Sequence, residues 1–193
     1  MFITLLLLAG CTKRNFFPDE DDPGLSLLTS NGFNIASSYI NKVPYINPYH
    51  NTIFGINNYL PTLRKIITNS AFDTLSLSWQ IEPNDSSLIY NAKYQSITLL
   101  IPVPKIFTQN DFLLLNGQRF SSNTNKINIQ SNYYLFNQLS GTSNIYFVEI
   151  KKDNSVDPKN YIISGLFDGN IGDSILITKG RFDFEIGAGS LNF

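Results

Sequence analysis

The sequence predicts an all-β domain, an antiparallel β-sandwich or open barrel of about nine or ten strands. Apolar and polar residues alternate with a period of two in segment after segment, which is typical of strands with one buried face. Asn is abundant, with 23 residues, and it favours turns over helix interiors. Aromatic residues make up 13% of the chain and suit the half-buried surface of a pleated sheet.

The clearest alternation lies in Thr74–Ile81 and Arg181–Ile186. In the second segment Asp183 and Glu185 lie opposite the apolar positions, so we expect both carboxylates to face solvent. Seven other segments have strand character, namely Phe33–Ile40, Ser96–Ile101, Phe112–Leu115, Lys126–Leu135, Asn144–Ile150, Tyr161–Phe167 and Ser174–Thr178. Turn-forming Asn, Asp, Gly and Pro separate most of these segments, which favours short connections between antiparallel strands.

Two stretches do not alternate. Tyr59–Ile67 carries apolar residues at helical spacing and is predicted as a short helix or a loop across one end of the sheet. Tyr39–Pro61 is rich in Tyr, Pro and Asn and reads as a long irregular connection, which can bind a ligand or simply pack on the core.

Composition excludes several classes of function. Charged residues make up 15% of the chain and the net charge is -1, so there is no basic footprint for nucleic acid. One His and one Cys cannot supply the usual ligands of a zinc, haem or iron–sulfur site, and they allow no disulfide within the chain. We therefore expect no cofactor and no metal.

The N-terminal residues carry a targeting signal. Residues 1–10 form an apolar run that is too short to span a bilayer but has the length of a signal-peptide core. The run ends in Leu8-Ala9-Gly10-Cys11, which resembles the lipobox of bacterial lipoproteins. The resemblance implies that Cys11 is lipidated and becomes the mature N-terminus, so that acyl chains attach the protein to a membrane. The alternative is a buried N-terminal strand with Cys11 in the core.

Residues 11–30 are predicted to form an acidic flexible tether between the lipid and a single β-domain at 31–193. Four consecutive acids at 19–22 lie between Pro18 and Pro23, and such a like-charge block stays extended. The same acids resemble the signal that exports some Bacteroidota lipoproteins to the cell surface. Location at the outer membrane therefore leaves two alternatives, the periplasmic side and the cell surface.

Short motifs in the domain resemble a group of uncharacterised Bacteroidota lipoproteins. They are Phe33-Asn34-Ile35-Ala36, Asn41-Lys42-Val43-Pro44-Tyr45, Ile163-Ser164-Gly165-Leu166-Phe167 and Ile177-Thr178-Lys179-Gly180-Arg181-Phe182. The resemblance implies a small β-rich domain in the cell envelope and brings no assigned activity with it.

Candidate catalytic residues are few. His50 is the single imidazole, in a turn-like setting, and the chain has no Gly-x-Ser-x-Gly elbow. Asp168 with Asp173, or Asp183 with Glu185, could form the carboxylate pair of a glycosidase, but their sequence spacing is common in non-enzymes. We therefore predict that the protein is not an enzyme.

The predicted function is a lipid-anchored envelope protein that acts as a binding or interaction module, with an envelope protein or a glycan as partner. The alternative is a surface glycan-binding lipoprotein, because exposed aromatic rings form stacking platforms for sugars. The Tyr residues considered for such a platform are Tyr45, Tyr49, Tyr59, Tyr133 and Tyr134.

Overall fold

The computed structural model describes residues 18–47, 60–85, 87, 94–131, 138–155 and 160–187. They form one antiparallel sheet of eleven strands. The strands are β1 (Ile35–Ile40), β2 (Val43–Ile46), β3 (Thr62–Ile66), β4 (Phe72–Gln80), β5 (Glu82–Pro83), β6 (Tyr94–Pro104), β7 (Arg119–Phe120), β8 (Lys126–Ser131), β9 (Gln138–Asp153), β10 (Asn160–Ile171) and β11 (Ile175–Gly187); a short 3-10 helix, η2 (Gln109–Leu115), lies between β6 and β7. The prediction of an all-β antiparallel fold is confirmed.

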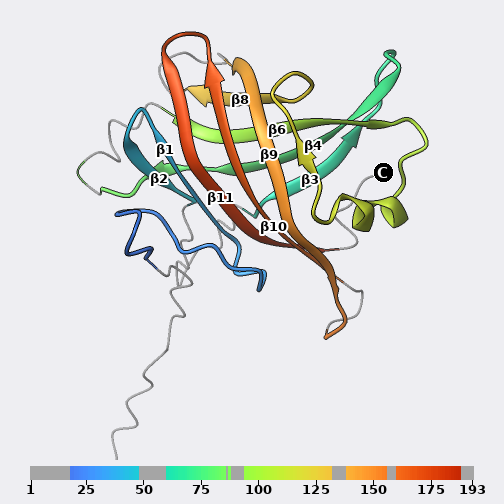
Figure 1. The fold of residues 1–193 in the computed structure, drawn as a ribbon, viewed down its shortest axis with the longest axis horizontal. Helices are drawn as coiled ribbons and strands as arrows, with labels where there is room; N and C mark the ends of the chain where they lie inside the picture. The colour runs from blue at the N-terminus through green and yellow to red at the C-terminus, as the bar shows by residue number, and fades with distance from the viewer. Residues whose placement is uncertain are drawn as a thin grey trace, which may run out of the picture.

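The sheet curls into an open barrel. Its strand order is β3-β4-β6-β8-β9-β10-β11-β1-β2-β5, and β7 pairs with β9 outside this path. Figure 1 shows the long strands β9, β10 and β11 crossing over β3, β4 and β6, so the two halves of the sheet face each other. At Ile81 the chain leaves β4, which pairs with β6, and enters β5, which pairs with β2. One corner of the barrel is therefore closed by a single bend in the chain.

The space between the two halves is filled by apolar side chains from alternate strand positions. Trp79 on β4 lies at its centre, with its ring centroid 5.4 Å from that of Phe167 on β10 and 5.4 Å from that of Phe184 on β11. Phe182 stacks on Phe184 at 5.7 Å. Because the side chains of a strand alternate between its faces, these positions agree with the predicted period of two.

Two glycines make room for these rings. Gly165 on β10 is paired with Phe182 on β11, and Gly180 is paired with Phe167 in the same ladder. A Cβ at Gly165 would lie 2.5 Å from the Phe182 ring, and one at Gly180 would lie 2.6 Å from the Phe167 ring. Each ring therefore covers the glycine opposite it, which gives the Ser-Gly-x-Phe and Lys-Gly-x-Phe sequences a packing role.

Three secondary-structure predictions are wrong. Tyr39–Pro61, predicted as a long irregular connection, contains strand β2 at Val43–Ile46, which pairs with β1 and β5. Tyr59–Ile67, predicted as a helix or loop, contains strand β3, in which Leu63 is buried and Ile66 is exposed. Phe112–Leu115, predicted as a strand, lies in η2, because Phe112 and Leu115 are buried at the three-residue spacing of a 3-10 helix. The side chain of Thr108 and the carboxylate of Asp111 form a capping box that starts this helix.

Candidate functional site

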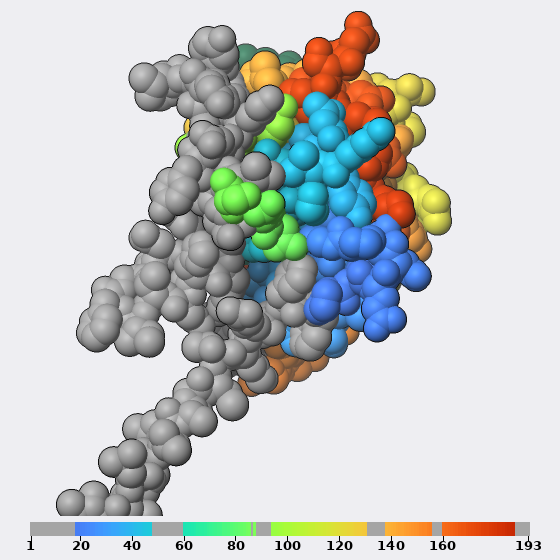
Figure 2. All heavy atoms as spheres, turned by 90° about the vertical axis from the view of Figure 1, so that its left-hand side faces the viewer, coloured from blue at the N-terminus to red at the C-terminus, as the bar shows by residue number. Residues whose placement is uncertain are grey.

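The outer face of β11 carries a buried polar cluster at the point where the N-terminal chain crosses it. Here the N-terminal segment means residues 18–34. Leu25 within it is fully buried, and its neighbour Ser26 bonds to Ser37 on β1, with 2.8 Å between the two hydroxyl oxygens. Figure 2 shows the N-terminal segment, in blue, packed against β1 and β2. The structure therefore differs from the predicted flexible tether over residues 18–30.

The acidic block is held by two cations of β11. We call the side chains of Asp19, Asp22, Lys179 and Arg181 the Arg181 cluster. The Arg181 guanidinium donates to the carboxylates of Asp19 and Asp22, and also to the Ser26 carbonyl oxygen at 3.0 Å. Lys179 pairs with Asp22 as well. Arg181 is 6% exposed, so this cation lies almost entirely under the N-terminal segment.

Ion pairing shifts the ionisation of the cluster. The hydrogen bond from Arg181 lowers the pKa of Asp19, and that from Lys179 lowers the pKa of Asp22. The bond to Asp22 in turn raises the pKa of Lys179. Asp19, Asp22 and Lys179 are therefore charged at neutral pH, and the two carboxylates are matched by cations instead of repelling each other.

Asp183 lies deeper beneath the same segment. Its carboxylate accepts backbone N–H bonds from Asn31 at 3.1 Å, Gly32 at 2.7 Å and Phe33 at 3.4 Å, and a bond from the Thr29 hydroxyl. The side chain is 1% exposed. The expectation of a solvent-facing Asp183 is therefore wrong: the residue does point away from the barrel core, but the N-terminal segment covers that face.

The other candidate carboxylates also have structural contacts. Glu185 accepts a bond from the Asn160 amide at 2.6 Å, and Asp168 accepts one from the Asn144 amide at 2.8 Å across the β9–β10 ladder. Asp173 is exposed in the turn between β10 and β11. The structure brings Asp183 and Glu185 onto one strand face, where they fasten neighbouring chain segments.

The remaining candidate residues divide into two groups. Tyr45 is 5% exposed and packs against Tyr94, with 5.8 Å between ring centroids, so it offers no open ring for a sugar. The others lie outside the described residues: Cys11, Tyr49, His50, Tyr59, Tyr133 and Tyr134.

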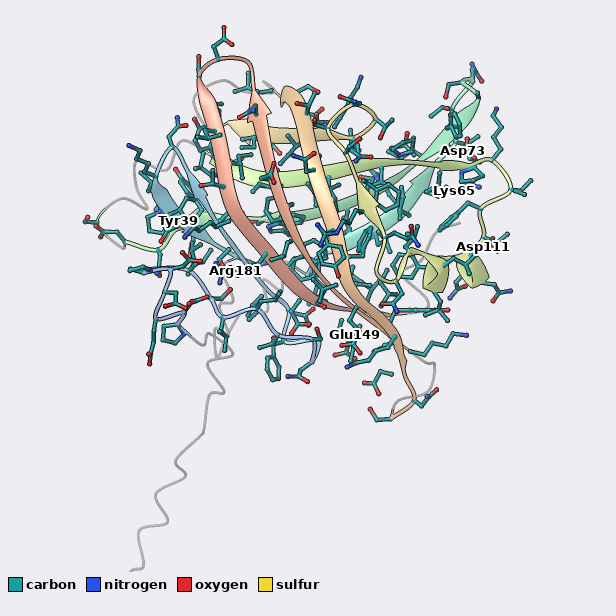
Figure 3. All side chains as sticks on the ribbon, in the orientation of Figure 1. Tyr39, Lys65, Asp73, Asp111, Glu149 and Arg181 are labelled. Atoms are coloured by element: carbon teal, nitrogen blue, oxygen red, sulfur yellow. The ribbon has the colours of Figure 1, made fainter. Side chains whose placement is uncertain are left out.

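A second feature lies where two turns meet, and sequence reasoning missed it. The β3–β4 hairpin and the turn after β6 together expose Ile66, Ile67, Phe72 and Ile106, which we call the apolar tip. The Ile-Ile pair just before an Asn-Ser turn is the signal for it in the sequence, but the helical spacing of this pair with Leu63 conceals that signal. Figure 3 shows Lys65 and Asp73, beside this tip, on the opposite side of the molecule from Arg181.

Lys65 fixes the two turns to each other, and we call its contacts the Lys65 clamp. The ammonium group donates to the Lys105 carbonyl oxygen at 2.7 Å and the Phe107 carbonyl oxygen at 2.8 Å, and lies 3.2 Å from the Asp73 carboxylate. Asp73 also accepts a bond from the Thr68 backbone N–H at 3.0 Å. That bond, followed by the one from Lys65, lowers the pKa of Asp73.

No protein-family model, curated protein or solved structure matches the chain. Among the residues that the structure describes, no helix has both the length and the hydropathy to cross a membrane. The same residues contain no group of three or more His, Cys, Asp and Glu side chains arranged to hold a metal ion. The proposals below therefore rest on the chain's own sequence and geometry.

Proposed function

We propose that this protein is a lipid-anchored cell-envelope protein whose β-barrel domain acts as a non-enzymatic binding or interaction module. Acyl chains on Cys11 attach it to the outer membrane, on the periplasmic side or at the cell surface. Its partner is an envelope protein or a glycan, and its role requires neither nucleic acid nor a cofactor. The anchor follows from the Leu8-Ala9-Gly10-Cys11 sequence.

The docking of the N-terminal segment carries this proposal. Seven residue-to-residue steps separate Cys11, the lipid-attachment site, from Pro18, where the described chain begins. They span at most about 25 Å when fully extended. Beyond them the chain is fixed to β11 through the Arg181 cluster and Asp183. Such a join keeps the domain close to the anchor, as expected of a membrane-tethered module.

The roles of the carboxylates support a non-enzymatic function. A glycosidase needs two carboxyl groups that face a substrate, one of them free to exchange a proton. Asp183 is buried and accepts four hydrogen bonds from the N-terminal segment, and Glu185 accepts a bond from Asn160. Their geometry suits fastening of the chain better than proton transfer.

Metabolic labelling with a clickable palmitate tests the anchor. Cells expressing the parent chain should incorporate label into this protein, and the Cys11→Ala variant should lose it because the acceptor thiol is gone. Thr12→Ala is the matched control, since it alters the adjacent residue and keeps the thiol, and it should label like the parent. Equal labelling of the parent and Cys11→Ala would refute the lipoprotein assignment.

A further inference from the structure

The apolar tip exposes more hydrophobic surface than isolated surface residues account for. Ile67 is 83% exposed and Ile106 is 85% exposed, with Phe72 at 55% and Ile66 at 37% beside them. Phe72 pairs with Pro104 in the β4–β6 ladder, two residues before Ile106. The four exposed side chains therefore lie on adjoining turns, and a concentration of exposed apolar side chains of this kind marks an interaction site.

The tip is held in shape by the Lys65 clamp. Lys65 joins the β3–β4 hairpin to the carbonyls that follow β6, and Lys105 returns a bond to the Thr68 carbonyl oxygen at 3.2 Å. Within the hairpin, the hydroxyls of Thr68 and Ser70 both donate to the Phe72 carbonyl oxygen. Because these bonds fix the backbone before any partner arrives, binding at the tip costs little ordering entropy.

The charges around the tip are positive. Arg64 and Lys105 are exposed beside it, whereas the nearby Asp73 is buried and paired with Lys65. Asp111 on η2 is a further acid on this side of the molecule (Figure 3), and its carboxylate is engaged by Thr108. The chain as a whole has a net charge of -1, and the acids at 19–22 lie on the opposite side of the molecule, so this cationic character is local.

We propose that the apolar tip inserts into the interfacial region of an anionic lipid membrane, with Arg64 and Lys105 on the headgroups. Apolar side chains that protrude from a pair of turns enter a fluid bilayer without a pocket of matching shape, which a protein partner would have to supply. Basic residues flanking an inserted apolar group add attraction to anionic lipid. The proposal rests on the proposed envelope location for the proximity of a bilayer, and it adds a second, non-covalent contact to the lipid at Cys11.

The lipid at Cys11 and the apolar tip together orient the domain on the membrane. The Arg181 cluster, next to which the anchored chain arrives, and the Lys65 clamp lie on opposite sides of the molecule (Figure 3). The lipid at Cys11 reaches the bilayer from one side and the tip enters it from the other, which places the domain lengthwise along the membrane surface. The covalent anchor raises the local concentration of the tip at that surface, so a weak intrinsic affinity is sufficient.

Vesicle co-sedimentation tests the proposal on the chain from residue 11 onward with Cys11→Ser. This protein carries no acyl chain and retains every described residue, so the result is independent of lipidation. We expect it to bind vesicles of equal parts phosphatidylcholine and phosphatidylglycerol and to bind pure phosphatidylcholine vesicles at least about tenfold more weakly. The Ile67→Ser/Ile106→Ser variant should lose at least about tenfold in partitioning, because two inserted side chains are removed.

Matched variants separate the tip from general effects. Lys105→Glu should weaken binding to the anionic vesicles by about tenfold, since it reverses a charge beside the tip. Leu176→Ser removes a side chain that is 51% exposed in another part of the sheet, and Lys42→Glu reverses an exposed cation in the β1–β2 turn; both should bind like the parent. Near-UV circular dichroism confirms that each variant is folded.

Three outcomes overturn the proposal. Tip variants that bind anionic vesicles as tightly as the parent exclude insertion at this site. Equal binding to neutral and anionic vesicles excludes the role of the flanking cations. If vesicles do not bind but sedimentation equilibrium shows self-association that Ile67→Ser/Ile106→Ser abolishes, the tip contacts a second copy of the chain instead of lipid. None of these results bears on the palmitate test at Cys11, so the two proposals fail separately.

Discussion

The Arg181 cluster and the Lys65 clamp each pair a largely buried cation with carboxylates, yet they join residues at very different separations along the chain. Arg181 binds Asp19 and Asp22, which lie about 160 positions away in the sequence. Lys65 pairs with Asp73, eight positions along the same hairpin, and with the backbone of the neighbouring turn. The first holds a segment onto the barrel, and the second shapes a surface. The same chemistry therefore serves global stability at one side and local order at the other.

Replacing Arg181 should destabilise the protein more than replacing Lys65. In Arg181→Met, Asp19 and Asp22 are left under the chain without their guanidinium partner, and the Ser26 carbonyl oxygen loses its donor. We expect the free energy of unfolding to fall by about 3 kcal/mol, as when one partner of a buried ion pair is removed. Urea unfolding measures the loss, and hydrogen exchange should rise throughout the N-terminal segment. A variant as stable as the parent would show that apolar contacts around Leu25 alone hold the segment.

Removing the cation of the clamp should have a smaller and more local effect. In Lys65→Met, Asp73 keeps its bond from the Thr68 backbone, and the barrel core is untouched. We expect a lower urea midpoint than the parent but a higher one than Arg181→Met. Hydrogen exchange should increase at residues 66–72 and 105–107, with β10 unchanged. Increased exchange across β10 would mean that the clamp supports the barrel as a whole, and the distinction between the two sides would fail.

The smallest change in stability is expected when the acidic block is titrated. Ion pairing lowers the pKa of Asp22 in the folded protein, so its contribution to stability is complete above its unfolded-state pKa and is lost as the pH falls through the folded value. The urea midpoint of the parent should therefore be steady from neutral pH down to about pH 4 and fall below it.

The Asp22→Asn variant isolates this contribution. It should be less stable than the parent at neutral pH, and the difference between the two urea midpoints should narrow as the solution is acidified. Asp21→Asn is a suitable control, because Asp21 is an exposed acid in the same block. If the parent and Asp22→Asn curves stay parallel throughout the acid range, Asp22 does not act through its charge.

The fold could be predicted because alternation is a local property of each strand. In β11 the positions of Phe182 and Phe184 follow directly from the period of two, and both lie in the core. Alternation does not indicate whether the opposite face of the strand is exposed to solvent or covered by another segment. Arg181 and Asp183 are covered by a segment 150 positions away, and the hint in the sequence was a match between four acids at 19–22 and the cations Lys179 and Arg181.

The apolar tip shows a second limit of prediction from sequence, because here apolar residues are exposed. Sequence patterns locate buried residues by assuming that apolar side chains point inward, and Ile66 and Ile67 break that assumption. Their helical spacing with Leu63 suggested one apolar face, whereas β3 buries Leu63 and exposes the pair. An exposed hydrophobic residue is thus recognised only once the backbone is known, because nothing in its identity distinguishes it from a core residue.

The pairing of β1 with β11 has a consequence for how the molecule is made. Ile35 near the start of the barrel lies opposite Asp183 near its end, and the N-terminal segment closes over that seam. Strand β1, the first of the described strands, must wait for β11, the last of them, before its hydrogen-bond ladder is complete. Contacts between such distant parts of a chain slow folding and leave strand edges unpaired in the meantime. Closure of this seam is accordingly a late step of folding, in which β11 pairs with β1 and the N-terminal segment docks over both.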